Sequence, residues 1–126
     1  MSKTVIHTDN APAAIGPYSQ AIKAGNTLYV SGQVPIVPAT GNIEGKDITE
    51  QTTQVFNNLK AIITEAGGTM DNVVKTTVYL QDIKDFVAMN NVYATYFTGN
   101  FPARVAVQVA ALPKGALVEI DAICVL

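Results

Sequence analysis

Cysteine, histidine and arginine each occur only once in this chain of 126 residues, as Cys124, His7 and Arg104. A single cysteine excludes a disulfide bond within the chain. One cysteine and one histidine cannot supply the several ligands of a zinc site, and no cluster of acids indicates a magnesium site. The glycine-rich loops that bind nucleotides are absent as well. We therefore expect a protein that uses neither a metal nor another cofactor.

Charged residues are also few, and their signs nearly balance. They make up 14% of the chain, the net charge is −2, and Lys and Arg never form a run. Nucleic-acid binders normally show a basic face, so we expect no nucleic-acid partner. No apolar stretch approaches the roughly 18 residues of a membrane span, and residues 1–7 do not read as a signal peptide, which predicts a cytoplasmic protein without membrane contact.

The chain does contain enough apolar material for one folded domain. Hydrophobic residues make up 48% of it, and no repeat, linker or low-complexity segment divides it. We expect a single domain over residues 1–126. Periodicity and turn residues predict helices over about 47–66 and 82–98, loops over 11–18 and 33–46, and strands over 3–7, 19–24, 27–32, 72–80, 103–110 and 117–125.

Turn and capping residues support several of these boundaries. Gly25-Asn26 fits a two-residue type II′ hairpin turn between the second and third strands, because glycine supplies the positive φ. Asp47 can cap the first helix, with Glu50 reaching back in a capping box. Gly67-Gly68 ends this helix, since glycine tolerates the left-handed cap.

Each predicted helix has one apolar stripe, and the element order is β-β-β-α-β-α-β-β. One stripe per helix favours a two-layer α+β fold with both helices on one face of a sheet. The other face of the sheet also carries apolar residues, and the chain has no third helix to cover it. We therefore expect copies of the chain to associate.

Arg104 is the first candidate for a functional residue. It is the sole arginine beside seven lysines, and it lies in a predicted strand on a face it shares with Ala106, Gln108 and Ala110. Small neighbours leave room in front of the guanidinium, whose fork of donors matches a carboxylate. A structural ion pair or an exposed strand charge fits the same pattern, so both interpretations stay open.

Glu119 is the second candidate, because an acid within an apolar strand is costly unless it has a partner. A partly buried glutamate can act as a general base toward water. The alternatives, a salt bridge to Arg104 or a lysine, or a solvated strand face, are more common. Tyr18 could contact a ligand or simply pack, and Ser31-Gly32 could line a pocket or mark a bulge.

Five segments of the chain carry a specific resemblance. They read Ala-Ile-Gly-Pro-Tyr-Ser-Gln over 14–20, Tyr-Val-Ser-Gly-Gln-Val-Pro over 29–35, Asp-Asn-Val-Val-Lys-Thr-Thr-Val-Tyr-Leu over 71–80, Phe-Pro-Ala-Arg-Val-Ala-Val over 101–107 and Leu-Val-Glu-Ile-Asp-Ala over 117–122. Each is weak alone. The set, in this order and spacing over nearly the whole chain, is similar to the Rid family, also called the YjgF or L-PSP endoribonuclease family.

The resemblance implies a chorismate-mutase-like α+β fold with a mixed sheet. Three chains would form a homotrimer whose sheets pack into a central barrel, with the helices outside and the sites in clefts between subunits. The implied activity is hydrolysis of 2-imino acids, such as 2-iminobutanoate and 2-iminopropanoate, to 2-oxo acids and ammonia. These small acids would be the ligands, and no metal or cofactor is implied.

The family's functional residues have counterparts in this chain. By this resemblance Arg104 would clamp the substrate carboxylate, Glu119 would position or activate the attacking water, and Tyr18 would contact the ligand. The residues that would line the pocket are Ser31, Gly32 and Asn90.

One departure from the family pattern lies two residues after the arginine. Many members have cysteine there, and this chain has Ala106. If the family uses only the backbone N–H at this position, Ala106 supplies it equally well. An activity that depends on the cysteine thiol would be lost. Two other functions stay open: a non-catalytic trimer that binds small carboxylates, and an endoribonuclease-type translation inhibitor. A mildly acidic chain without a histidine pair argues against RNA cleavage.

Overall fold

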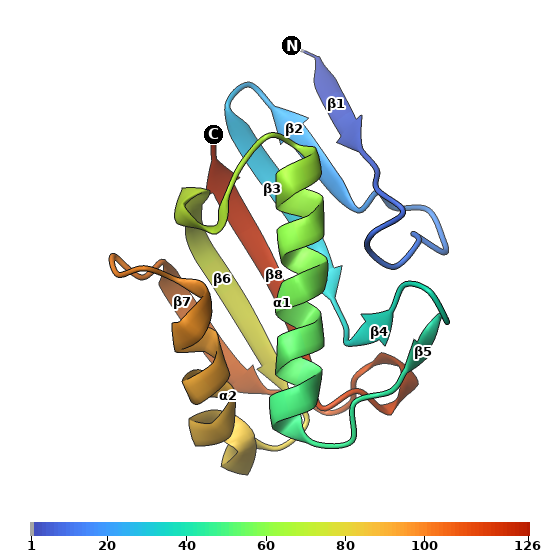
Figure 1. Cartoon of the computed structure of the whole chain (residues 1–126), viewed down its shortest axis with the longest axis vertical. Coiled ribbons are helices and arrows are strands. Elements are labelled where there is room, and N and C mark those ends of the chain that lie inside the picture. The colour runs from blue at the N-terminus through green and yellow to red at the C-terminus, as the bar shows by residue number, and fades with distance from the viewer. Residues whose placement is uncertain (1) are drawn as a thin grey trace.

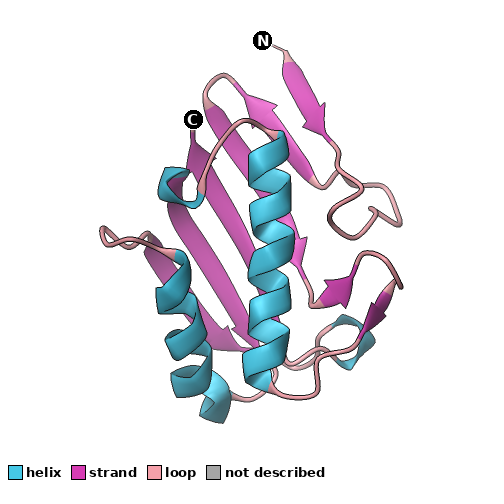
Figure 2. Ribbon diagram, in the orientation of Figure 1, coloured by secondary structure: helices cyan, strands magenta, loops and turns pink. Residues whose placement is uncertain are grey.

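The computed structural model describes residues 2–126 and shows two layers, a sheet and a pair of helices (Figure 1). The main sheet has six strands in the order β1-β2-β3-β8-β6-β7. Their bounds are β1 Lys3–Ile6, β2 Ala21–Ala24, β3 Thr27–Gln33, β6 Val73–Leu80, β7 Ala103–Gln108 and β8 Val118–Val125. Helices α1 (Ile48–Glu65) and α2 (Phe86–Tyr93) pack together on one face, as predicted (Figure 2). Within residues 2–126 no helix is long and apolar enough to cross a membrane.

The sheet is mixed, because β6 and β7 run parallel while the other neighbouring strands are antiparallel. A parallel pair needs a crossover, and α2 lies in the connection between these two strands. This crossover leaves β7 as an edge strand beside α2. The predicted turn between β2 and β3 is confirmed, since Ala24 pairs with Thr27 and Gly25 has a φ of 60°.

Helix α1 begins and ends where its sequence predicts. The Asp47 carboxylate accepts a hydrogen bond from the Glu50 N–H at 2.8 Å. The Glu50 carboxylate reaches back to the Lys46 N–H at 3.0 Å, one residue earlier than in an ordinary capping box. Beyond the last turn, Gly67 adopts a φ of 90°, the left-handed conformation that ends a helix.

The loop predicted over residues 33–46 is wrong in part, because it contains a small hairpin. Its strands are β4 (Ile36–Val37) and β5 (Asn42–Ile43), with Gly41 in the turn at a φ of 73°. Asn58 of α1 donates to the Ile36 carbonyl at 2.9 Å and so fastens the hairpin to the helix. Strands of two residues are too short to produce a visible period in the sequence.

The single helix predicted over residues 82–98 is also wrong in part. The α-helix spans only Phe86–Tyr93 and is flanked by 3₁₀ turns at Ile83–Asp85 and Ala94–Tyr96. At the start, the Asp82 carboxylate accepts from the Lys84 N–H at 2.9 Å, and at the end the Thr95 hydroxyl donates to the Val92 carbonyl at 2.7 Å. Asp82 thus caps the 3₁₀ turn before the helix, and the Thr95 hydroxyl bonds back to the backbone at the end of the helix.

The core lies between the sheet and the helices. Its largest fully buried side chains include Phe56, Leu28, Leu59, Ile62, Ile63, Leu80, Met89 and Ile120. The Phe56 ring of α1 makes an edge contact with the Tyr93 ring at 5.4 Å and stacks on the Tyr96 ring at 4.6 Å. These aromatic contacts fix α2 against α1 and thereby fix the side chains that α2 presents to β7.

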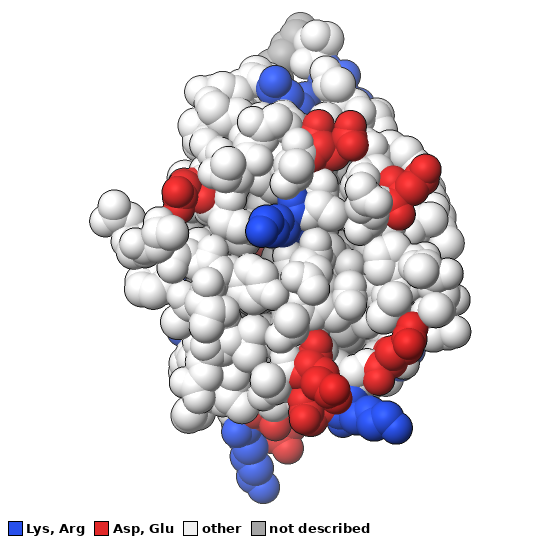
Figure 3. All heavy atoms as spheres, in the orientation of Figure 1, with Lys and Arg blue, Asp and Glu red and all other residues white. Residues whose placement is uncertain are grey.

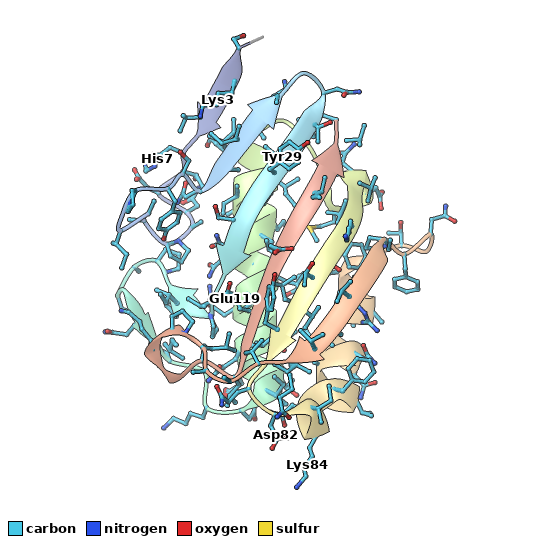
Figure 4. The ribbon with its side chains drawn as sticks, turned by 180° about the vertical axis from the view of Figure 1, so that it is seen from behind. Lys3, His7, Tyr29, Asp82, Lys84 and Glu119 are labelled. Atoms are coloured by element: carbon cyan, nitrogen blue, oxygen red, sulfur yellow. The ribbon has the colours of Figure 1, made fainter. Side chains whose placement is uncertain are left out.

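The sheet face away from the helices is open in the single chain (Figure 4). The apolar residues predicted there are present, and Tyr29, Val105 and Val107 are 51%, 44% and 39% exposed. Exposed apolar side chains on one face of a sheet, here on β3 and β7, mark a surface that gains free energy by association. The association of copies through this face remains a prediction.

Candidate active site in two halves

Arg104 lies on β7 with its side chain on the helix-covered face. Its Nη1 donates to Asn90 Oδ1 at 2.6 Å. The guanidinium carbon lies 4.8 Å from the ring centroid of Tyr93 and 5.2 Å from that of Phe86. Phe86, Asn90 and Tyr93 are spaced by four and three residues, so α2 presents all three from one face. An amide and two aromatic faces therefore hold the arginine in place.

The guanidinium borders a cleft of about 460 Å³. The lining residues are Asn90, Tyr93, Ala94, Phe101, Pro102 and Arg104. Within residues 2–126 the bond to Asn90 is the one hydrogen bond that the guanidinium makes. Its other N–H groups are free to bind a planar anion, and a carboxylate fits this fork of donors.

Tyr93 supports the arginine from the buried side. Its hydroxyl shares a hydrogen bond of 2.7 Å with the Thr76 hydroxyl. Burial raises the pKa of Tyr93, and the bond to Thr76 and the charge of Arg104 offset this only in part. The phenol therefore stays neutral and presents its ring face to the cation.

Glu119 lies on β8, on the open face of the sheet (Figure 4). It is half-buried, and its pKa is raised, first by burial and second by the charge of Asp121. Gly32 of β3 lies against the carboxylate so closely that a Cβ there would collide with Glu119 Oε2. Glycine at this position leaves the space that the carboxylate occupies, and a larger residue would push the carboxylate aside.

Glu119 and Gly32 line a second cleft, of about 320 Å³, with Tyr18. The Tyr18 side chain is 52% exposed and comes from the loop before β2. Ile15 and Lys114 lie at the same cleft. The structure therefore brings together three of the predicted site residues: Tyr18, Gly32 and Glu119.

The loop that carries Tyr18 is held by Gln20, a residue that sequence reasoning missed. Its buried amide accepts from the Thr8 N–H at 2.8 Å and donates to the carbonyls of Thr8 at 3.0 Å and Pro12 at 2.9 Å. The amide thus supplies the hydrogen bonds that a neighbouring strand would give. The available signal was a polar residue inside the predicted strand 19–24, directly before its apolar residues Ala21 and Ile22.

Two predicted pocket residues lie apart from these clefts. The Ser31 hydroxyl turns back to the Ser19 carbonyl at 2.6 Å, and Ser31 lines a separate hollow of about 320 Å³ on the open face with Lys75 and Asp121. Ala106 follows Arg104 on the same side of β7 but does not line the arginine cleft.

Arg104 and Glu119 lie on opposite faces of the sheet. On β6, Thr76 is paired with Arg104 and Tyr79 with Glu119, and side chains three residues apart on a strand point to opposite faces. A salt bridge between the two within one chain is therefore excluded. The chain carries two half-sites, an arginine half-site formed by Phe86, Asn90, Tyr93 and Arg104 and a glutamate half-site formed by Tyr18, Gly32 and Glu119.

The remaining reactive side chains do not add to either half-site. Cys124 is buried, and burial raises the pKa of its thiol to about 11, so it stays protonated. His7 lies near the β1 edge of the sheet, opposite to β7, and contacts Asp9 at 3.1 Å. Across residues 2–126 no three His, Cys, Asp or Glu side chains form a metal-binding group. Figure 3 shows acidic and basic residues scattered over the helix-covered side without a basic patch.

Known proteins are similar to this chain over nearly its whole length. The family model described as Endoribonuclease L-PSP matches residues 8–126. A RutC family protein of Pyrococcus horikoshii is 59% identical over 96% of each chain. The 2-iminobutanoate/2-iminopropanoate deaminase of Mus musculus is 51% identical over 98% of this chain and 91% of its own. The crystal structure of E. coli TdcF with bound serine aligns with a TM-score of 0.94, 40% identity and 98% of each chain covered.

Proposed function

This chain belongs to the Rid/YjgF family, and we propose its function from that premise. We infer that it hydrolyses 2-imino acids, such as 2-iminobutanoate and 2-iminopropanoate, to 2-oxo acids and ammonia. The proposal rests on one observation: Arg104, the sole arginine, is held beside a cleft by Asn90 and two aromatic rings. The deaminases of mouse and rat among its relatives agree with this activity.

In this proposal Arg104 binds the carboxylate of the substrate. A bidentate pair between guanidinium and carboxylate fixes the plane of the acid and so the direction of the adjacent imine carbon. The serine bound to E. coli TdcF is a small amino acid with the same kind of carboxylate. The cleft at Arg104, about 460 Å³, has room for an acid of this size.

Glu119 then accepts a proton from the attacking water. A protonated imine is already electrophilic, so the protein needs to orient water and substrate, without a covalent nucleophile. Water adds to the imine carbon, and the proton taken up by Glu119 passes to the nitrogen. Glu119 then takes the remaining hydroxyl proton as the carbonyl forms and ammonia leaves. Tyr18 and Gly32 form the wall of this half-site.

The complete site is shared between two copies of the chain. Arg104 and Glu119 cannot meet across one sheet, and the open face with Tyr29, Val105 and Val107 is available for a neighbour. A homotrimer with its sheets around a central barrel, the assembly that the family resemblance implies, would pair each arginine half-site with a glutamate half-site. Sedimentation of the chain as a monomer at working concentration would contradict this part.

The test compares 2-oxobutanoate formation from 2-iminobutanoate, generated in situ, with and without protein. We expect the wild type to exceed spontaneous hydrolysis and Arg104→Ala to fall to the spontaneous rate. Arg104→Lys keeps the charge but lacks the fork, so it should recover only part of the rate. Binding of 2-oxobutanoate without any turnover would instead favour a carboxylate-binding protein. RNA cleavage that Arg104→Ala abolishes would favour the ribonuclease alternative.

A further inference from the structure

We infer that Asp121, fixed in place by Tyr79, is a positioning residue that acts through Glu119: its negative charge favours the uptake of a proton from water by Glu119. This inference rests on the proposed function. Asp121 lines neither of the two clefts of the half-sites, so it acts through Glu119 and does not touch the substrate.

The strand register places Asp121 beside Glu119. The two residues are separated by one position on β8, so their side chains share the open face about 7 Å apart along the strand. Tyr79 of β6 stands directly opposite Glu119, and Thr77 stands opposite Asp121. The Tyr79 side chain crosses diagonally between the two acids, a distance that an aromatic residue can span.

Hydrogen bonds fix both oxygens of the Asp121 carboxylate. The Tyr79 hydroxyl donates to Oδ2 at 3.1 Å, and the Thr77 backbone N–H donates to Oδ1 at 3.2 Å. Burial and the bond to Asp121 raise the pKa of Tyr79, so its hydroxyl keeps the proton that it donates. The Asp121 side chain is therefore held in one orientation, next to a half-buried glutamate.

No cation neutralises this pair of acids. The charged and titratable groups around them are Tyr79 on β6, Tyr18 and Lys114 at the Glu119 cleft, and Tyr29 of β3 and Lys75 of β6 at the hollow beside Asp121. The Lys114 ammonium donates to the Gly41 carbonyl at 3.2 Å. Within residues 2–126 neither Glu119 nor Asp121 forms an ion pair.

The unneutralised charge acts in the direction that proton transfer needs. Like charge disfavours the ionised form, and Asp121 adds to the effect of burial in raising the pKa of Glu119. A general base with a pKa closer to the working pH takes a proton from water more readily. Asp121 thus contributes to the raised pKa of Glu119 without lining the cleft.

Selective labelling makes Glu119 directly observable. The chain has four glutamates, so ¹³C-carboxyl labelling of glutamate gives four NMR signals, and Glu119→Gln identifies the signal of interest. We expect Asp121→Asn to move the titration midpoint of Glu119 to lower pH in the full assembly. Tyr79→Phe, which frees Asp121 but keeps its charge, should move it less. Glu65→Gln removes an equal charge from the exposed end of α1 and should not move it.

Activity supplies the second readout. The acid limb of the kcat/KM profile for imine hydrolysis should move to lower pH in Asp121→Asn, in step with the NMR midpoint. An Asp121→Asn midpoint that stays at the value of the Glu65→Gln control overturns the inference, as does a lowered midpoint with an unmoved acid limb. If Asp121→Asn does not fold, the same comparison with Tyr79→Phe decides. If the wild type hydrolyses no imine, the proposed function and this catalytic role fail, and the midpoints show separately whether Asp121 controls Glu119.

Discussion

The arginine and glutamate half-sites are positioned in different ways. Arg104 lies on an edge strand, and side chains of a short helix hold it through one hydrogen bond and two ring contacts. Glu119 lies on β8, with paired strands on both sides and the backbone of Gly32 against its carboxylate. The arginine half-site depends on the side chains of α2 that contact Arg104. The glutamate half-site depends on Gly32 having no side chain, which leaves room for the carboxylate. Substitutions should therefore affect the two halves by different routes.

The largest expected effect tests whether the halves come from different copies. Arg104→Ala and Glu119→Gln should each lower kcat/KM by about 10²–10⁴-fold, the range for loss of a positioned acid–base or anchoring group. Mixed and refolded together, the two inactive variants should regain activity, because some interfaces then contain both native residues. The measurement is imine hydrolysis by the mixture.

The control for this mixing experiment is a chain that carries both substitutions. Mixed with Arg104→Ala, this double variant supplies no intact arginine and should stay inactive. A mixture of the two single variants that is no more active than its components would contradict a site shared between copies.

Gly32→Ala should be the next largest change, and it probes the glutamate half alone. The added methyl group takes the place of Glu119 Oε2, so the carboxylate must turn away. Because the displaced group is the end of a flexible side chain, we expect the fold to survive while kcat falls by about 10²-fold. Circular dichroism and turnover measure the two quantities. Binding of 2-oxobutanoate should be retained, and its loss would show that the two halves are not independent.

Asn90→Ala should have a smaller effect, confined to the arginine half. It removes the acceptor that lies 2.6 Å from Arg104 Nη1, so the guanidinium is held less firmly. Hydrogen bonds to charged groups contribute about 1.5–3 kcal/mol, and at this exposed site we expect a rise in KM of about tenfold. Asn91→Ala changes the same residue type at the next, exposed position of α2 and should leave KM unchanged. Equal effects at both positions would contradict the role of Asn90.

Tyr93→Phe should have the smallest effect on catalysis and should act on stability. It keeps the ring beside Arg104 but removes the buried hydroxyl that bonds Thr76 at 2.7 Å. The free energy of unfolding should fall by about 1 kcal/mol, measured by urea titration at fixed protein concentration. Tyr96→Phe removes only longer bonds, of 3.1 Å to exposed Asn57 and 3.4 Å to the Thr53 carbonyl, and should cost less. A large loss of activity in Tyr93→Phe would show that the hydroxyl does more than support the ring.

The layers of the fold were accessible from the sequence because they depend on local signals. Asp47 and Gly67-Gly68 mark the ends of α1, and Gly25 marks the first hairpin, each by a conformational requirement of that residue type. The hairpin β4–β5 and the broken ends of α2 were not accessible. The hairpin is fastened by Asn58 of α1, whose partner Ile36 is known only after folding, and the bond from Thr95 to the Val92 carbonyl is local but leaves no period in the sequence.

The same limit applies to the candidate site. Alternation within a strand indicates which neighbours of Arg104 share its face, but it does not relate one strand to another. Only the register of β6 against β7 and β8 shows that Arg104 and Glu119 lie on opposite faces. Phe86 and Tyr93 read as ordinary core residues in the stripe of the second helix, and nothing in the sequence distinguishes them as the support of a cation.

Gln20 has a consequence for how this scaffold can change over evolutionary time. Its amide bonds to Thr8 and Pro12 and so holds the loop before β2, while Ile15 in the same loop is 76% exposed. Substitutions at Ile15 therefore alter the rim of the Glu119 cleft without disturbing the sheet or the anchor. A lineage could widen or narrow its range of acids there by single mutations, each nearly neutral for folding, while the proposed catalytic residues stay unchanged.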